Sequence, residues 1–236
     1  MTLSKRLSAA ANWVSQGSRL CDVGTDHAAL PIWLVQEGRI AFALAADIRP
    51  GPLDRARHNV ERYGCAEAIE LRLCDGLSGV SPGETDTVTI CGMGGNMIVS
   101  ILEAAPWTKQ GVELILQPQK SQNELRHWLA QNGYRVLEER VLWEERHWYT
   151  LLRVRGGLPN DYGCLGALVA GLPQLWCQMD DWIGYLSDLE QRLTRQKSGL
   201  KRSEKGPDPV RLKELRTVLA EIVQWRGQLE RGVWPE

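Results

Sequence analysis

The sequence predicts an α/β fold in which a mostly parallel sheet is closed by an antiparallel strand pair and followed by a helical hairpin. Three observations carry this prediction. Apolar, β-prone runs alternate with helical periodicity through the first two thirds of the 236 residues. Two further strand-like runs then follow each other with no room for a helix between them. Heptad-spaced apolar residues occupy the remainder.

Five of the strand-like runs define the parallel part of the predicted sheet. They lie at 19–23, 41–47, 69–74, 86–91 and 112–117. Helical periodicity occurs near 28–37, 51–63, 94–104 and 121–132. Strands that alternate with helices are typically parallel and joined by right-handed crossovers. The runs 134–142 and 147–155 should instead form an antiparallel hairpin around Glu144, Glu145 and Arg146, because only a short turn separates them.

A Gly/Pro linker at 156–160 precedes a change in composition. The apolar residues beyond it recur at spacings of three and four. In the first helix they are Leu175, Met179, Trp182, Leu186, Leu189, Leu193 and Leu200, and in the second Leu212, Leu215, Leu219, Ile222 and Leu229. Two such helices joined by a Gly/Pro turn predict an antiparallel coiled-coil hairpin, and two helices packed on the main domain are the alternative. The expected domains are 1–157 and 158–236.

The tip of this hairpin is basic, although the whole chain has a net charge of only −1. Its nine cations are Arg192, Arg195, Lys197, Lys201, Arg202, Lys205, Arg211, Lys213 and Arg216. Three acidic residues, Glu204, Asp208 and Glu214, accompany them. This patch would suit phosphate contacts, with Arg195, Lys201 and Arg202 as the candidates. A solvated coiled-coil face is the alternative.

Composition indicates a cytoplasmic protein with a proper core. The N-terminus lacks the apolar segment of a signal peptide, and no apolar run approaches the roughly 20 residues that span a bilayer. The six cysteines include no C-x-x-C pair, so free thiols are expected rather than disulfides or a metal site. The oligomeric state is open because the coiled coil could close on itself or on a partner. A monomer is favoured.

Acidic residues follow three successive strands, where parallel strands end at one edge of the sheet. Asp22 is followed by Gly24, which lets the chain turn sharply and approach a ligand. Asp47, with Ile48 beside it, is placed to accept both hydroxyls of a ribose, and Asp75, with Gly76, to bind the exocyclic amine of an adenine. Asp22 could accept from an ammonium group. This set suits an adenosyl ligand that also carries an ammonium.

A dinucleotide site is the competing interpretation, but it requires G-x-G-x-x-G in the first turn. That turn has a single glycine. The segment from Gly92 through Met93 and Gly94 to Gly95 comes closer to the pattern, yet it follows the fourth strand, which usually faces the reacting group. An oxidoreductase that uses NAD is therefore disfavoured.

Each of these residues also has a purely structural interpretation. Asp22, Asp47, Asp26 and Asn96 could cap helices, and His27 could be a hydrogen-bonded structural histidine. The glycines at 92, 94 and 95 could only shape a turn. Trp128, Trp143 and Trp148 are expected in the core or at its rim, although an exposed one could stack on a base.

Several segments of the chain form a recognisable set. They are LSKRL at 3–7, DVGTDH at 22–27 with LP at 30–31, GP at 51–52, CDGL at 74–77, TICGMGG at 89–95, LQP at 116–118 and LRHWL at 125–129. In order and spacing this set resembles the bacterial tRNA (adenine-22-N1)-methyltransferases. The resemblance covers about residues 3–155, and the DVGTDH and GMGG pair is its most specific part. Family members also carry a coiled-coil appendage.

The resemblance implies the class I methyltransferase form of the Rossmann-like fold, S-adenosylmethionine as methyl donor and a tRNA adenine in the D-arm region as acceptor. Asp22, Gly24, Asp47 and Asp75 fall on donor-binding positions, and Asp26 on the acceptor side. Asp47 stands where the family often has Glu. Thr25 and Ala29 replace the commoner Ser and Tyr, so a stacking role at position 29 is in doubt.

The reaction expected from this resemblance is an in-line attack of adenine N1 on the sulfonium methyl. Methylation leaves the base cationic, so a nearby carboxylate would stabilise the product and could take a proton. Asp26 is the candidate, with His27 as orienter or alternative base. Gly92 is assigned to the donor, and Met93, Gly94, Gly95 and Asn96 to the acceptor. Alternative functions are methylation of another RNA or a protein, or RNA binding without catalysis.

Overall fold

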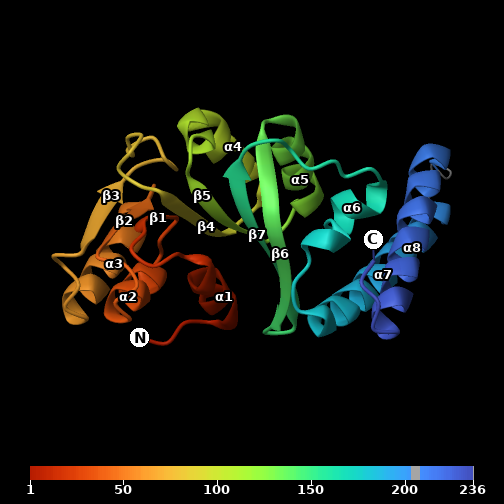
Figure 1. Cartoon of the computed structure of the whole chain (residues 1–236), viewed down its shortest axis with the longest axis horizontal. Helices are drawn as coiled ribbons and strands as arrows, with labels where there is room; N and C mark the ends of the chain where they lie inside the picture. The colour runs from red at the N-terminus through yellow and green to blue at the C-terminus, as the bar shows by residue number, and fades with distance from the viewer. Residues whose placement is uncertain (203–207, 236) are drawn as a thin grey trace.

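The computed structural model describes residues 1–202 and 208–235 and contains one seven-stranded sheet. The strands are β1 (Arg19–Val23), β2 (Phe42–Asp47), β3 (Ile69–Leu73), β4 (Thr87–Met93), β5 (Glu113–Pro118), β6 (Tyr134–Glu144) and β7 (His147–Gly156). Their order is β3-β2-β1-β4-β5-β7-β6 (Figure 1). β1 to β5 are parallel, and β7 runs antiparallel to both β5 and β6. The predicted α/β class and the antiparallel closure are confirmed.

Helices cover both faces of this sheet. The elements α1 (Lys5–Trp13), α2 (Ala29–Gln36) and α3 (Pro50–Arg62) share one hydrophobic core with the sheet. The elements α4 (Gly95–Ala104) and α5 (Gln122–Gln131) share the other, beside the short helix η1 (Pro106–Lys109). The sequence predicts α2 to α5 but misses α1. That helix starts at the cap Ser4, whose side chain accepts from the Leu7 N–H, and it buries three alanines that carry little periodic signal.

The last strand pair forms a tight hairpin with a two-residue turn. Trp143 lies opposite Trp148, and Glu144 opposite His147. The turn residues Glu145 and Arg146 have φ values of +48° and +66°. Both residues therefore occupy the left-handed region, which two-residue hairpins require and which usually selects Gly or Asn.

The C-terminal part begins with α6 (Leu165–Ala170) and η2 (Pro173–Leu175), followed by α7 (Met179–Lys201) and α8 (Pro209–Glu230). The two long helices pack side by side, and they are antiparallel because Trp176, just before α7, contacts Trp225 near the end of α8 (Figure 1). The predicted first helix starts too early, since Leu175 lies in η2. None of the helices in the described part of the chain is long and apolar enough to cross a membrane.

The hairpin of α7 and α8 also packs on the sheet. The two helices therefore pack against each other, as in the predicted hairpin, and against the main domain, as in its alternative. Val141 of β6 lies in one core with Trp182, Leu186 and Ile222. Beside this core, Arg126 of α5 and Glu139 of β6 form an ion pair at 2.7 Å with both side chains fully buried. Lys205 and Glu204 of the predicted basic tip lie outside the described residues.

Candidate functional site

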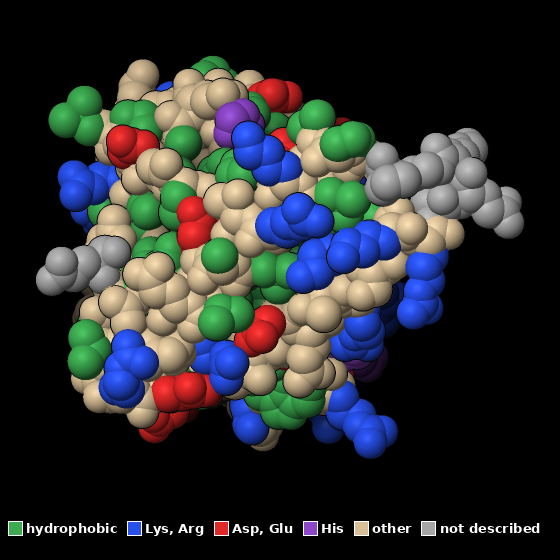
Figure 2. All heavy atoms as spheres, turned by 90° about the vertical axis from the view of Figure 1, so that its right-hand side faces the viewer, with side chains coloured by type: hydrophobic (Ala, Val, Ile, Leu, Met, Phe, Trp, Pro, Cys, Tyr) green, Lys and Arg blue, Asp and Glu red, His purple; other side chains and the backbone are tan. Residues whose placement is uncertain are grey.

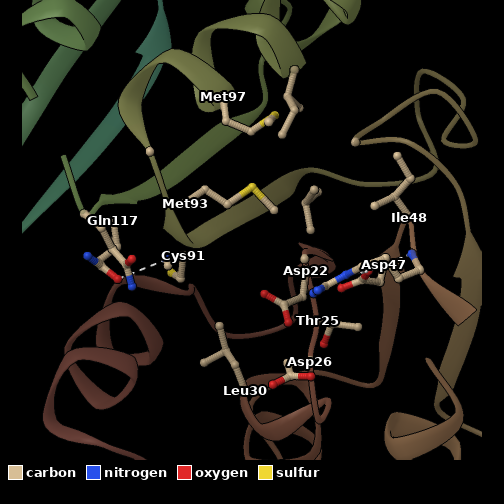
Figure 3. A pocket seen from close by; sticks show the side chains of 18 of the residues that line it. Asp22, Thr25, Asp26, Leu30, Asp47, Ile48, Cys91, Met93, Met97 and Gln117 are labelled. Carbon is tan, nitrogen blue, oxygen red and sulfur yellow. Dashed lines mark hydrogen bonds and ion pairs between the residues drawn. The ribbon is translucent and has the colours of Figure 1, made fainter. Parts of the chain in front are cut away.

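A cavity of about 990 Å³ opens at the carboxyl ends of the parallel strands (Figure 3). Residues that follow β1, β2, β3, β4 and β5 all contribute to its wall. Twelve of the sequence-predicted residues line it: Asp22, Gly24, Asp26, His27, Asp47, Ile48, Asp75, Gly76, Gly92, Met93, Gly94 and Asn96. Ligands of open α/β sheets bind in this position, where the strand order reverses between β1 and β4.

The turn after β1 brings bare backbone to the cavity. Gly24 has a φ of +78°, and its N–H donates to the Ala46 carbonyl at 2.8 Å. A Cβ on Gly24 would overlap the terminal methyl of Met93. The positive φ therefore favours glycine here, whereas the flexible end of the Met93 side chain can move aside. The helix that follows is capped by Ala28, so neither Asp22 nor Asp26 is its cap.

Asp22 is a buried carboxylate, 8% exposed, at the floor of the cavity. The Thr89 hydroxyl donates to it at 2.6 Å. Burial raises the pKa of Asp22, and the bond from Thr89 opposes that shift. No cationic side chain of the described residues forms an ion pair with Asp22. A ligand ammonium would supply the missing charge.

Asp47 and Asp75 border the part of the cavity beyond β2 and β3. Asp47 is 4% exposed, and its Oδ1 accepts from the Arg49 N–H at 2.8 Å. The cap of α3 is Arg49, so Asp47 is not a helix cap. Asp75 is exposed at the rim, next to Gly76, while Ile48 and Met97 leave more than half of their surface open. Carboxylates beside exposed apolar side chains suit a ribose and a flat base.

Asp26 and His27 lie on the open side of the turn. The carboxylate of Asp26 pairs with Arg55 and lies 3.3 Å from the Nε2 atom of His27. The hydrogen bond from Arg55 lowers the pKa of Asp26. Asp26 is therefore a weak base that stays charged at neutral pH, which favours stabilisation of a cation over proton abstraction.

The loop after β4 is fixed by the neighbouring strand end. Gly92 has a φ of +81°, and its N–H donates to the Gln117 Oε1 atom at 3.1 Å. Gly94 caps α4, so Asn96 is not the cap and lies exposed in the first turn. Gly95 does not line the cavity, contrary to its expected place at the acceptor. Its N–H donates to the Lys120 carbonyl at 2.7 Å, and a Cβ would overlap the backbone of Ser121.

Sequence reasoning missed one wall of the cavity. The end of β5 supplies Gln117, the loop after it supplies Gln119, Lys120 and Ser121, and α1 supplies Arg6. Gln117 is buried, and its Nε2 donor has no hydrogen-bond partner among the described residues. The loop was predictable, because the carboxyl end of a fifth parallel strand must meet the same edge.

The basic residues of the hairpin are separate from this cavity. Arg195, Lys201 and Arg202 are exposed on α7 and just after it, and none of them lines the cavity. Figure 2 looks onto the end of the molecule that carries α7 and α8, and Lys and Arg side chains gather on one half of that face. The structure does not bring these residues together with Asp22 or Asp26.

Residues 3–152 match a family model described as a methyltransferase domain. The tRNA (adenine(22)-N(1))-methyltransferase of Bacillus subtilis (strain 168) is 38% identical over 158 residues, 66% of each chain. The matched stretch thus covers slightly less than two thirds of that relative. A ribosomal protein L11 methyltransferase from an Exiguobacterium strain is 28% identical over 152 residues, 47% of its length.

Solved structures resemble the whole chain. A putative tRNA (m1A22) methyltransferase from Streptococcus pneumoniae has a TM-score of 0.80 at 33% identity and covers 97% of this chain and 99% of its own. TrmK from M. capricolum, in complex with S-adenosyl-homocysteine, has a TM-score of 0.81 at 29% identity, with 97% and 100% covered. The chain therefore belongs to the methyltransferase-domain family and, within it, to the tRNA (adenine(22)-N1)-methyltransferases.

Proposed function

We propose that this chain methylates the N1 nitrogen of adenine 22 in the D-arm region of tRNA, with S-adenosylmethionine as donor. The observation that carries the proposal is Asp22 on the floor of the cavity, a buried carboxylate that pairs with no cation among the described residues. It agrees with relatives described as tRNA (adenine(22)-N(1))-methyltransferases, one of them solved with S-adenosyl-L-methionine. Action in the cytoplasm, where tRNA is found, follows from the proposal.

Different residues of the cavity bind the amino-acid part, the ribose and the adenine of the donor. Asp22 binds its ammonium group, and the backbone at Gly24 allows the amino-acid part to lie close to the turn. Asp47 accepts the ribose hydroxyls, while Ile48 and Met97 cover the adenine and Asp75 accepts from its amine. When bound, the donor supplies an electrophilic sulfonium methyl, and the protein contributes position.

Asp26 stabilises the acceptor. The N1 lone pair forms the new N–CH₃ bond as the S–CH₃ bond breaks, so the adenine gains a positive charge and the donor leaves as a neutral thioether. A carboxylate with a lowered pKa favours that cation without taking a proton. His27, 3.3 Å from Asp26, positions this carboxylate. The target base must leave its stack to reach the cavity.

We also assign residues 1–157 to the catalytic domain and 158–236 to a domain that contacts tRNA through Arg195, Lys201 and Arg202. All three are exposed cations, as phosphate contacts require. The two parts share the core around Val141, so this role is tested by substitution in the full chain and not by deletion.

The deciding experiment uses labelled donor and two tRNA transcripts, one with adenine and one with guanine at position 22. We expect label only in the adenine transcript, with the modified nucleotide mapped to position 22 as N1-methyladenine. Ribosomal protein L11 serves as a third acceptor, because an L11 methyltransferase is among the relatives. Label in L11 alone, or equal label in both transcripts, would refute the proposal.

Substitution of Asp26 tests its role in turnover. We expect Asp26→Ala to bind the donor normally. Its kcat should be about 10- to 100-fold lower, which is at or slightly below the loss caused by removing one group that stabilises charge in a transition state. Asp54→Ala, which removes an exposed carboxylate of α3, is the matched control. Undiminished methylation by Asp26→Ala would exclude Asp26 from the reaction.

A further inference from the structure

A second cavity of about 650 Å³ adjoins the first, and none of the residues assigned above to the donor lines it. Its walls are the loop after β5, the tip of the β6–β7 hairpin and one side of α7. We propose that it receives the RNA strand next to the target adenine, binding a phosphate and one unpaired base. This proposal rests on the proposed function, since it names where the same substrate continues beyond the catalytic cavity.

The two cavities share one wall. Gln119, Lys120 and Ser121 line both of them. A strand whose flipped adenine enters the first cavity must therefore pass this loop, and the neighbouring nucleotide reaches the second cavity. Continuity of this kind is what a polymeric substrate needs and a small ligand does not.

The charge of the second cavity suits a phosphate. Its fixed cations are Lys120, Arg146 and Arg192, and its only lining carboxylate within the described residues is that of Asp188. Arg192 pairs with Asp188 at 2.9 Å on the surface of α7. Lys120 and Arg146 then remain as the cations that a backbone phosphate can approach from two sides.

An exposed tryptophan provides a stacking surface on the same wall. Trp143 leaves 46% of its surface open, and its ring centroid lies 5.2 Å from that of Trp148. Trp148 is itself fixed, because its ring lies edge-on to Tyr185 at 6.0 Å and against Gly184, where a Cβ would come within 2.7 Å of it. The exposed indole is thus held in place before a base arrives, and bases stack on such aromatic side chains in single-stranded nucleic acids.

The turn that carries Arg146 is strained. Neither Glu145 nor Arg146 is a glycine, yet both have positive φ. Such conformations persist where the surrounding structure fixes them, and they are concentrated at functional sites. Here the turn projects Arg146 at the mouth of the second cavity, three residues from Trp143.

The test uses the full chain with Trp143→Ala and Arg146→Gly, neither of which touches the donor cavity. Glycine keeps the φ of +66° at 146, so that variant preserves the turn. We expect each to raise the KM and the Kd for tRNA about tenfold, while kcat at saturating tRNA and donor affinity stay within twofold. Arg146→Gly should also reduce the slope of log Kd against log salt by about one.

Two controls separate stacking from folding. Trp143→Phe keeps an aromatic face and should restore most of the affinity, whereas Trp234→Ala removes another exposed tryptophan, 40% open, and should change nothing. Unchanged tRNA affinity in both Trp143→Ala and Arg146→Gly would overturn the proposal. If the wild-type protein transfers no methyl group to tRNA, the proposed function fails instead, and the tRNA Kd still decides whether this cavity binds RNA.

Discussion

Asp22 and Glu139 are both buried carboxylates, but their surroundings differ. Arg126 donates to Glu139 from Nε at 3.0 Å and from Nη2 at 2.7 Å, and its Nη1 donates to the carbonyls of Leu168 and Val169. Asp22 accepts from the neutral hydroxyl of Thr89 and faces the open cavity. Burial raises the pKa of both groups, and for Glu139 the guanidinium opposes that shift.

This difference distinguishes a carboxylate that stabilises the fold, Glu139, from one that we propose binds the donor, Asp22. The charge of Glu139 is balanced within the protein, and its partner Arg126 ties α5 to β6 and α6. The charge of Asp22 is not balanced by a protein cation in the described part of the chain, so it weakens the fold until a cation arrives. A buried charge left for a ligand is the expected compromise of a binding site between stability and affinity.

The largest effect should come from the balanced pair. Arg126→Met leaves Glu139 buried without its partner, which typically costs about 3–5 kcal/mol of unfolding free energy. Urea unfolding measures this loss. The double variant Arg126→Met/Glu139→Leu should recover most of it, because both charges are removed together. A loss below about 1 kcal/mol for the single variant would show that the pair does not hold the junction.

Asp22→Asn should act in the opposite direction on stability. The variant keeps the shape of the side chain and removes the unbalanced charge, so the free energy of unfolding should stay equal or rise. Donor affinity should fall about 10- to 100-fold, the value of a hydrogen bond between charged groups. Calorimetric titration with S-adenosylmethionine measures this loss, and Asp54→Asn on exposed α3 is the control. Unaltered donor affinity would remove Asp22 from the site.

The raised pKa of Asp22 predicts a pH dependence of donor binding. Acidification from neutral pH protonates this group at a pH above its ordinary 3.8, which weakens its contact with an ammonium. In the wild type, donor affinity should therefore fall as the pH decreases from neutral toward 3.8. In Asp22→Asn it should change little over the same range. The sign for stability is opposite: the contribution of Asp22 is fully present below pH 3.8 and is lost as the pH rises through the raised pKa. Matching pH profiles for the two proteins would contradict this assignment.

The smallest effect on folding should come from the exposed cations of the hairpin. Arg195→Gln, Lys201→Gln and Arg202→Gln together should leave the unfolding free energy within about 0.5 kcal/mol, because surface charges contribute little to it. The affinity for tRNA should fall several-fold, and each lost phosphate contact should reduce the slope against log salt by about one. An unchanged slope would mean that these cations do not contact phosphates and only form a solvated face of the helical hairpin.

Local patterns predicted most of the sheet and its polar edge. The alternation of strands and helices placed Asp22, Asp47 and Asp75 after successive parallel strands, and all three line the cavity. The alanine-rich α1 gave no comparable signal, although Arg6 reaches the cavity. Gly95 shows the opposite error. The GMGG motif predicts one unit at the ligand, but Gly95 lies against the Ser121 backbone whereas Gly92 and Gly94 line the cavity.

The sequence by itself determined the order of the elements, the antiparallel closure and the edge at which the acidic residues meet, because these depend on periodicity and on the handedness of crossovers. Only the tertiary structure decided that Arg126 and Glu139 form a buried pair and that Asp22 has no such partner within residues 1–202 and 208–235. The same is true of the second cavity, whose walls come from the loop between β5 and α5, the β6–β7 turn and α7. Burial and charge balance depend on contacts between segments distant in the chain, and no local pattern encodes those contacts.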